Sequence, residues 1–291
     1  MACRNRSGEE IALFDNPDGM IRFLYDCAAG GAALRVLTLP CISRLTGRLM
    51  DTRLSRALIG PFIRKSGIDL SDYEPVRYAS FNEFFRRRIR EEARPVDFSP
   101  EHLIAPCDGK LSVFPIDDDA VFEIKGTAYT LQQLLRSRSL AERFRGGTLM
   151  LFRLAVDDYH RYAYPAGGVE SRSVHIPGRY HTVNPHAASR RAIYRENTRE
   201  YSLLRTEQFG AVLMMEIGAL LVGKIVNHAG GGPVRRGQEK GYFEFGASSI
   251  ICCFEKGRVL PDEDLIKNTR EGYETRVRFG EKIGKSGAVI K

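Results

Sequence analysis

The sequence predicts an α+β fold, in which an N-terminal helical layer is followed by a mainly antiparallel β domain. Between residues 20 and 66, apolar residues recur at spacings of three and four, which is the period of a helix. After Pro95, short β-branched or aromatic runs alternate with Gly, Pro and Asp, as in strands joined by tight turns. We therefore divide the chain into a helical region, residues 1–80, and a β-rich domain, residues 81–291.

The helical region is strongly basic. Between residues 20 and 65, eight Lys and Arg stand against only Asp26 and Asp51, in a chain of net charge +8. A basic amphipathic stretch can lie on an anionic membrane surface, but it can equally be a helical layer with its Arg side chains in water. Both interpretations stay open on this pattern alone. The apolar stretch from Cys27 to Ser43 is interrupted by Arg35, so we expect no membrane-spanning helix.

The composition is that of an ordinary globular protein of 291 residues, which excludes disordered, collagen-like and repeat-dominated chains. The N-terminus, MACRNRSGEE, lacks the apolar core of a signal peptide. The six Cys lack the C-x-x-C spacing of a zinc site, and the adjacent Cys252 and Cys253 have the character of buried apolar strand residues. We expect no metal and a reducing compartment.

The elements can be predicted in chain order. Residues 66–80 are polar and rich in turn formers, so we interpret them as a connection. Residues 81–92 predict a short helix, whose Arg86–Arg88 run is either a phosphate-binding group or a solvated face. A longer helix is predicted over 131–144. The clearest strands are predicted over 110–116, 148–156, 211–217, 220–226 and 248–254.

Reactive side chains in the β-rich domain stand next to tight turns. Asp108 lies in a turn before a strand, His160 just past a strand end, and His181 begins the run His-Thr-Val-Asn-Pro. Ser248 follows a turn of small residues. Each signal is weak alone, because a turn Asp usually caps and a single His is usually structural. Together Asp108, His160 and Ser248 supply an orienting carboxylate, a base and a nucleophile, although the serine-hydrolase elbow G-x-S-x-G is absent around Ser248.

With these motifs placed, the sequence resembles a known family, the pyruvoyl-dependent phosphatidylserine decarboxylase proenzymes. The stretch Gly241-Tyr-Phe-Glu-Phe-Gly-Ala-Ser-Ser-Ile-Ile-Cys-Cys-Phe254 is similar to their self-cleavage segment, in which a Gly-Ser-Thr turn precedes an apolar strand. Further motifs follow the order of that family, so the resemblance covers about residues 80–255. They are Phe81-Asn-Glu-Phe-Phe85, Pro106-Cys-Asp-Gly109, Asp158-Tyr-His-Arg161, His181-Thr-Val-Asn-Pro185, Glu196-Asn197 and Val222-Gly-Lys-Ile225.

The resemblance implies a pyruvoyl enzyme. The Oγ of Ser248 would attack the carbonyl of Ala247, and elimination would cut the chain into a β chain, 1–247, and an α chain, 248–291. Hydrolysis of the resulting dehydroalanine would release ammonia and leave a pyruvoyl group as a self-generated cofactor. Its carbonyl would form a Schiff base with the amine of phosphatidylserine and act as electron sink while CO₂ leaves, which yields phosphatidylethanolamine.

The family pattern also implies roles for individual residues. Ser248, not Ser249, matches the pyruvoyl precursor, because Ser249 occupies the family's Thr position. Asp108 would orient the base. His160 would act as the base, or as the proton donor after decarboxylation.

Two departures from the family pattern affect this assignment. Many members read Tyr-His-Arg-x-His and use the second His as the base, but that position is Ala163 in this chain. Either His160 takes the role or His181 replaces it, because members without the second His tend to carry His-Thr-Val-Asn-Pro. The other departure is Ala247, where relatives have Gly, which adopts a positive φ at little cost. We expect self-cleavage to proceed, but slowly if the scissile turn needs that geometry.

An anionic lipid substrate would also explain the basic helices, because each Lys or Arg near an anionic surface contributes about 1 kcal/mol. We expect a peripheral membrane protein on the cytoplasmic face of a cell membrane, where it binds phosphatidylserine. Its α and β chains would form a heterodimer, which could dimerise further, and no nucleic acid is expected as a partner. Two alternatives stay open: a pyruvoyl decarboxylase of a soluble amino acid, and a non-catalytic basic protein that binds membranes or nucleic acid. The latter lacks an aromatic platform among its basic residues.

Overall fold

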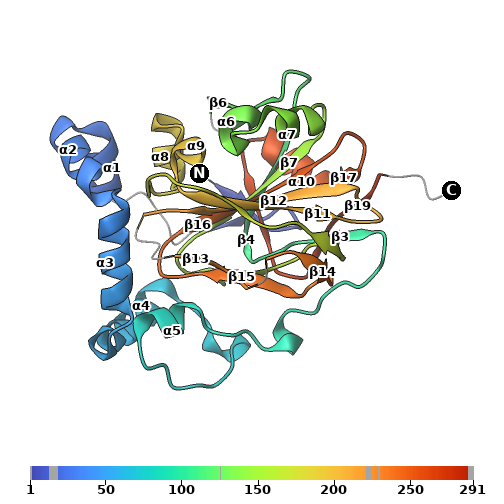
Figure 1. Ribbon diagram of the computed structural model, residues 1–291. Coiled ribbons are helices and arrows are strands. Elements are labelled where there is room, and N and C mark those ends of the chain that lie inside the picture. Colours follow the sequence, from blue (N-terminus) through green and yellow to red (C-terminus); the bar gives the residue numbers. More distant parts are fainter. Residues whose placement is uncertain (1, 13–18, 125, 221–223, 229, 288–291) are drawn as a thin grey trace.

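The structure is a computed structural model and describes residues 2–12, 19–124, 126–220, 224–228 and 230–287. A large, mainly antiparallel sheet forms its centre, with short helices above it and a small three-stranded sheet below it (Figure 1). The N-terminal helices stand as a column at one side of this β domain (Figure 1). The predicted fold class, an N-terminal helical layer followed by a mainly antiparallel β domain, is confirmed.

The helical column consists of four α-helices and a 3-10 helix. Its elements are α1 (Gly19–Asp26), α2 (Ala28–Leu37), α3 (Pro40–Met50), η1 (Arg53–Leu58) and α4 (Ile59–Ser66). Pro40 occupies the first turn of α3, where its missing N–H costs nothing, and Gly67 ends α4 at a φ of 67°. The α1–α2 corner depends on Gly30, because a Cβ there would lie 1.9 Å from the carbonyl oxygen of Phe23.

The large sheet has eleven strands, and its central strand β16 lies between β12 and β7. Its pairs are antiparallel except β1 with β18, which is parallel. Because β1 and β2 extend this sheet, residues 3–4 and 10–11 belong structurally to the β domain rather than to the helical column. In sheet order the strands are β14 (Gly232–Val234), β9 (Gly168–Glu170), β11 (Arg199–Arg205), β12 (Ala211–Gly218), β16 (Ser248–Phe254), β7 (Thr148–Leu154), β4 (Gly109–Pro115), β18 (Glu274–Val277), β1 (Cys3–Arg4) and β2 (Glu10–Ile11), with β10 (Val174–Ile176) also paired to β11.

Three smaller sheets and several short helices complete the β domain. The small sheets are β13 (Ile225–Asn227) with β15 (Glu239–Phe243) and β8 (Arg161–Ala163), β17 (Val259–Pro261) with β19 (Lys282–Ser286) and β3 (His102–Ile104), and β5 (Val121–Ile124) with β6 (Thr127–Thr130). The helices are η2 (Leu70–Asp72), α5 (Phe81–Phe85), η3 (Glu91–Ala93), α6 (Leu131–Leu135), α7 (Arg138–Arg143), α8 (Pro185–Arg190), α9 (Ile193–Glu196) and α10 (Glu263–Arg270).

Most predicted elements are confirmed, and the differences have local causes. Strands β4, β7, β12 and β16 occupy the predicted runs, and β16 has the predicted bounds. The helix predicted over 131–144 is wrong as one element, because Arg136 adopts a left-handed φ of 51° and divides it into α6 and α7. The helix predicted over 81–92 ends at Phe85. Of the strand predicted over 220–226, only its last two residues lie in β13, and residues 221–223 lie outside the described residues.

Two hydrophobic clusters form the interior. The larger one packs both faces of the large sheet and includes Cys252 and Cys253, whose predicted burial is confirmed. The smaller one is built on Phe81, Phe84 and Phe85 of α5. Residues of the helical column pack against this smaller cluster, and so does Phe245, three residues before Ser248. The aromatic side of α5 therefore joins the helical column to the predicted cleavage segment.

Among the described residues, no helix is both long enough and apolar enough to cross a membrane.

Candidate active site

Strand β16 places the two adjacent serines on opposite faces of the large sheet. In its ladder Ser248 is paired with Gly218 of β12 and Ser249 with Ile217, and successive strand residues alternate between the faces. Both serines are fully buried. Within the described part of the chain, neither serine hydroxyl makes a hydrogen bond, which is unusual for buried polar groups.

Polar neighbours identify which layer each serine faces. Arg199 of β11 lies on the same face as Ser249, and its guanidinium donates to a backbone carbonyl of α6 at 2.8 Å. Glu216 of β12 lies on the same face as Ser248, and its carboxylate is 2.9 Å from Nζ of Lys240 in β15. Ser249 thus faces the helices, whereas Ser248 faces the small sheet formed by β13, β15 and β8. This difference supports the assignment of Ser248 as the reactive serine.

His160 immediately precedes β8 and is fully buried. Its Nδ1 lies 3.0 Å from the backbone carbonyl oxygen of Asp158, which can only accept, so the proton resides on Nδ1. Its Nε2 is buried and makes no hydrogen bond within the described residues. This arrangement leaves an unused lone pair on Nε2, as a general base requires.

The surroundings of His160 keep its imidazole neutral. Burial away from water lowers the pKa of His160 to about 3 and outweighs the opposite effect of the Asp158 carboxylate. The positive charges of Arg87 and Lys110 lower it further. Neutral imidazole is the form that can accept a proton from a serine hydroxyl.

The segment before Ser248 packs on the same aromatic ring as His160. Phe85 of α5 has its ring centroid 4.2 Å from that of His160 and 5.3 Å from that of Phe245. Between Phe245 and the scissile bond, Gly246 adopts a φ of 134°, a conformation that L-residues rarely adopt. Ala247 is not among the residues with a positive φ. The left-handed position of this turn is therefore residue 246, which is Gly, and not residue 247.

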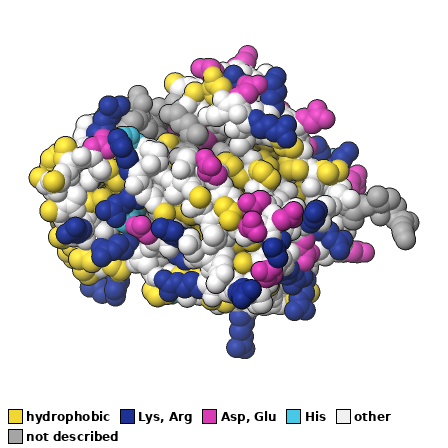
Figure 2. Space-filling view, turned by 90° about the horizontal axis from the view of Figure 1, so that it is seen from above, with side chains coloured by type: hydrophobic (Ala, Val, Ile, Leu, Met, Phe, Trp, Pro, Cys, Tyr) yellow, Lys and Arg dark blue, Asp and Glu magenta, His cyan; other side chains and the backbone are white. Residues whose placement is uncertain are grey.

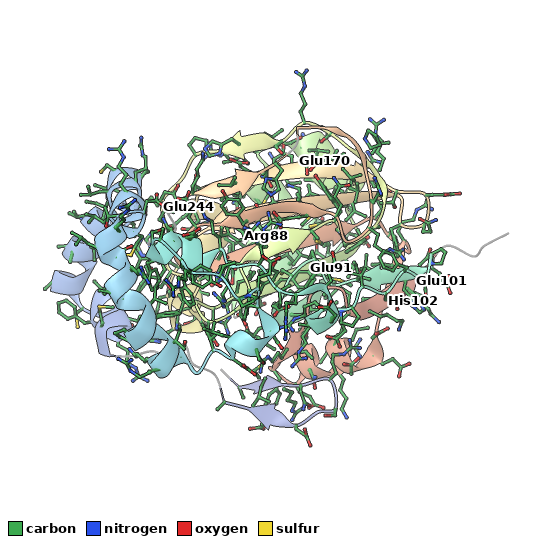
Figure 3. All side chains as sticks on the ribbon, turned by 90° about the horizontal axis from the view of Figure 1, so that it is seen from below. Arg88, Glu91, Glu101, His102, Glu170 and Glu244 are labelled. Carbon is green, nitrogen blue, oxygen red and sulfur yellow. The ribbon has the colours of Figure 1, made fainter. Side chains whose placement is uncertain are left out.

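Asn82 ties the cleavage segment to the helical column. Its Oδ1 accepts from the backbone N–H of Phe245 at 3.2 Å, and its Nδ2 donates to Gly47 and to the carboxylate of Asp51, each at 3.1 Å. Glu244 begins the same segment, and Figure 3 places it on the side where the column meets the β domain. Burial, and then the charge of Asp51, raises the pKa of the Glu244 carboxyl.

His181 is held beside the strand that pairs with Ser248. The side-chain amide of Asn197 accepts from the backbone N–H of His181 at 2.9 Å and donates to its carbonyl at 2.8 Å. The same amide donates to the carbonyl of Gly218 at 2.9 Å, and Gly218 is the ladder partner of Ser248. The Glu196-Asn197 motif thus fixes the His181 loop against the end of β12.

Each ring nitrogen of His181 has a polar side chain beside it. Nδ1 lies 3.2 Å from the hydroxyl of Tyr25 in α1, and Nε2 lies 3.3 Å from the carboxylate of Glu196. The Tyr25 hydroxyl also accepts from the backbone N–H of Thr182 at 3.2 Å. Contact with His181 lowers the pKa of Glu196. Within the described residues neither Nε2 makes a hydrogen bond, but that of His181 has the Glu196 carboxylate beside it, whereas that of His160 has no ion-pair partner.

Asp108 is engaged by an arginine. Its carboxylate accepts from Nε and Nη2 of Arg94, at distances from 2.8 to 3.2 Å, and from the backbone N–H of Phe279 at 2.8 Å. Arg94 also pairs with Asp72 at 3.0 Å. Within the described residues, Asp108 makes no hydrogen bond to His160. The structure therefore brings Asp108 against Arg94 rather than against a histidine, and a backbone carbonyl orients His160 instead.

Ala163, where many members of the family have the second His, lies at the far end of β8. It lines a cavity of about 870 Å³ together with Arg94, Arg161 and Tyr159. Along β8, Ala163 shares the face of Arg161, opposite to that of Tyr162. A longer side chain at position 163 would thus stand beside the cavity that Arg94, the partner of Asp108, also lines.

Sequence reasoning did not identify Tyr25, Asn82 or Arg87 as parts of this site. Asn82 lies inside a motif of the family and could have been found there. Tyr25 is separated from His181 by 156 residues, and no local pattern marks it. Among the described residues, no cluster of three His, Cys, Asp or Glu side chains that could hold a metal ion is present.

Comparison with known proteins identifies the family. The sequence profile of the family described as phosphatidylserine decarboxylase matches residues 81–285. The chain is 42% identical over 271 residues to phosphatidylserine decarboxylase proenzyme 2 of Clostridium acetobutylicum, covering 92% of each chain. It is 39% identical over 273 residues to phosphatidylserine decarboxylase proenzyme of Fusobacterium nucleatum, covering 92% of this chain and 91% of that one. The chain belongs to the phosphatidylserine decarboxylase family.

Proposed function

We propose that this protein decarboxylates phosphatidylserine to phosphatidylethanolamine and CO₂, with a pyruvoyl group that it makes from Ser248. One observation carries the proposal. Two complementary groups, the Ser248 hydroxyl and Nε2 of His160, are buried without hydrogen bonds in the described residues. A buried polar atom without a partner needs an explanation, such as a catalytic role. Ser249 and His181 also carry such an atom, but Ser249 faces the helices and the Glu196 carboxylate lies beside His181. The similar proteins are named phosphatidylserine decarboxylase proenzymes, and the similarity covers 92% of this chain, which also supports the proposal.

Self-cleavage would begin with transfer of the Ser248 hydroxyl proton to Nε2 of His160. The Oγ then attacks the carbonyl carbon of Ala247. The bond from this carbon to the Ser248 nitrogen breaks as His160 gives its proton to that nitrogen, which converts the peptide into an ester with a free amine. Loss of the Ser248 Cα proton expels the Ala247 carboxylate together with Oγ, and this cuts the chain. Water adds to the dehydroalanine that remains, ammonia leaves, and a pyruvoyl group caps the new α chain.

The surroundings of Ser248 fit such a group. It would stand at the start of β16, inside the protein, with the unpartnered Nε2 of His160 available to the reacting atoms. When present, the pyruvoyl carbonyl supplies an electron sink for loss of CO₂. His160 would hold the proton that is returned to the substrate carbon, and the aromatic ring of Phe85 would exclude water from its ring face.

The helical column, within residues 1–80, would dock the enzyme on an anionic bilayer as a peripheral protein. Figure 2 shows hydrophobic side chains gathered over the column, with Lys and Arg among and around them. Such a mixture suits a membrane surface, where apolar groups enter the interface and cations meet anionic headgroups. The exposed apolar residues of the column are Met20, Phe23, Val36, Leu45, Leu49, Leu54 and Leu58.

Intact mass of the purified protein tests the chemistry. We expect a β chain ending at Ala247 and an α chain with a blocked N-terminus. Ser248→Ala should leave the chain uncut, and the matched variant Ser249→Ala should still be cut. An uncut wild-type chain that stays uncut on incubation would refute the proposal.

Substrate choice needs a second measurement. We expect CO₂ from vesicles containing phosphatidylserine and none from free serine or other amino acids. Release from a free amino acid alone would instead identify a pyruvoyl decarboxylase of a soluble substrate. A cut enzyme that turns over detergent-dispersed phosphatidylserine but fails to sediment with anionic vesicles would refute the docking role of the column.

A further inference from the structure

Arg87 is a buried cation without a carboxylate partner. Its side chain is almost fully buried, although it is the middle residue of a run of three arginines. In the described part of the chain its guanidinium donates to backbone carbonyls and to the hydroxyl of Tyr73, and it contacts no acidic side chain. The guanidinium carbon lies 4.4 Å from the ring centroid of Tyr73. A buried, unpaired charge is costly, so its retention calls for a specific role.

The guanidinium holds the two groups that fix the His160 ring. Nη2 donates to the carbonyl of Asp158 at 3.3 Å, the same oxygen that accepts from Nδ1 of His160. Nη2 also donates to the carbonyl of Asp157 at 3.2 Å. Nη1 donates to the carbonyl of Phe85 at 3.4 Å, and the Phe85 ring packs on His160. The Arg87 guanidinium thus links the carbonyl that accepts from the His160 imidazole to Phe85, whose ring packs on that imidazole.

Arg87 also sets the charge around this histidine. The charged groups that act on His160 are Asp158, Lys110 and Arg87. Lys110 is neutralised by Asp158, since their side chains are 2.6 Å apart. Arg87 is therefore the unbalanced charge, and it repels a proton on the imidazole.

We propose that Arg87 is a positioning residue that fixes His160 as a neutral base with Nε2 directed at the reacting serine. The inference rests on the proposed self-cleavage at Ser248. It does not extend to the neighbours of Arg87. Arg86 donates to the hydroxyl of Tyr242, and Arg88 is exposed on the face seen in Figure 3.

The test follows the self-cleavage rate of the full chain, translated in vitro and then incubated across a range of pH. We expect Arg87→Gln to be cut at least about tenfold more slowly than wild type, because a displaced base is inefficient. Its rate should also fall on acidification at a pH where wild type is still unaffected. Added guanidinium ion should restore part of the rate. Arg88→Gln, the matched control, should behave as wild type.

Each result decides the matter. Folded Arg87→Gln, judged by circular dichroism and a cooperative thermal transition, refutes the inference if its rate and pH profile equal those of wild type. A slower rate with an unchanged pH profile and no rescue by guanidinium would also refute it, because it would show only loss of packing.

If Arg87→Gln does not fold, Arg87→Lys replaces it. That variant should be slow but keep the wild-type pH profile, and a shifted profile would contradict the charge role. Absence of cutting in wild type would refute the proposed function itself, whereas normal cutting in folded Arg87 variants refutes this inference alone.

Discussion

The hydroxyl of Tyr25 lies 3.2 Å from Nδ1 of His181, so a helix of the N-terminal column directly contacts a candidate catalytic residue. The same helix, α1, exposes Met20 and Phe23 to the surroundings. Asp26, which follows Tyr25 at the end of α1, has its carboxylate 3.0 Å from Nε2 of His186 in α8. This ion pair is a second contact between α1 and the β domain. The surface proposed to meet the bilayer and the His181 loop are therefore one connected unit.

We expect Tyr25→Phe to slow turnover of phosphatidylserine in vesicles while self-cleavage stays normal. The variant keeps the ring but loses the hydrogen bonds to His181 and Thr182, at a cost of about 1–2 kcal/mol in stability. Self-cleavage should persist because the proposed base is His160. Turnover and the fraction of cut chain, measured on one preparation, test this. Unchanged turnover, or an uncut chain, would contradict it.

The pH dependence of self-cleavage should be flat on the acid side. Burial lowers the pKa of His160 to about 3, so the imidazole stays neutral and able to accept a proton well below neutrality. We therefore expect no loss of rate between about pH 8 and pH 5. A base with the usual histidine pKa would instead lose rate below about pH 6.5. A pulse-chase measurement at several pH values distinguishes the two cases.

The turn before the scissile bond makes an asymmetric prediction for its two small residues. Gly246 adopts a φ of 134°, whereas Ala247 does not have a positive φ. Gly246→Ala should destabilise the turn by about 1–2 kcal/mol and slow self-cleavage. Ala247→Gly should change the rate little, although Gly is the family's residue there. The half-times of cutting of both variants provide the comparison, and a strong acceleration by Ala247→Gly would be the contrary result.

Two adjacent glycines of α2 should respond differently to one added methyl group. A Cβ on Gly30 would overlap the backbone of α1, but a Cβ on Gly31 would meet no atom within 4 Å. We expect Gly30→Ala to separate α1 from α2 and weaken vesicle binding. Gly31→Ala should bind normally and gain about 0.5–1 kcal/mol, because Ala favours helix over Gly. Co-sedimentation with anionic vesicles and thermal unfolding measure both effects.

The buried pair of Arg153 and Glu274 should contribute to folding rather than to chemistry. It joins β7 to β18 at 2.6 Å, with both side chains almost fully buried. Glu274→Gln removes the negative charge beside the buried Arg153 guanidinium, so we expect a loss of about 3–5 kcal/mol in the free energy of unfolding. The control Glu271→Gln breaks the more exposed pair with Arg4, which water screens, so it should cost far less stability. Denaturant titration of both, in the uncut Ser248→Ala background, gives the comparison.

Local pattern was sufficient for much of the fold. The run 248–254 was recognisable as a strand because buried β-branched and apolar residues fill it, and β16 has those bounds. The prediction of one helix over 131–144 was wrong, because nothing in the periodicity of that stretch reveals the left-handed conformation of Arg136. Arg86–Arg88 was predicted as a phosphate-binding group or a solvated face, yet Arg87 is buried, since its role depends on carbonyls 70 and 71 residues away in the chain.

The candidate site was predictable in its inventory but not in its pairing. Ser248, Asp108, His160 and His181 were all named from motifs, and the family pattern implied that Asp108 orients a histidine. The partner of Asp108 is Arg94, and this follows from the approach of the 91–94 turn to the β3–β4 turn, which only the folded chain supplies. Which histidine assists Ser248 likewise depends on hydrogen bonds made by backbone carbonyls and by Tyr25.

The place of β16 at the centre of the large sheet has a consequence for the processed protein. A cut before Ser248 would leave the new α chain hydrogen-bonded on both edges to strands of the β chain, β12 on one side and β7 on the other. The two chains would therefore stay associated through these backbone hydrogen bonds. The covalent continuity that guided β16 into place would nevertheless be gone. Maturation would therefore be a one-way step, and enzyme that is unfolded after it should fail to reassemble where the uncut Ser248→Ala chain refolds.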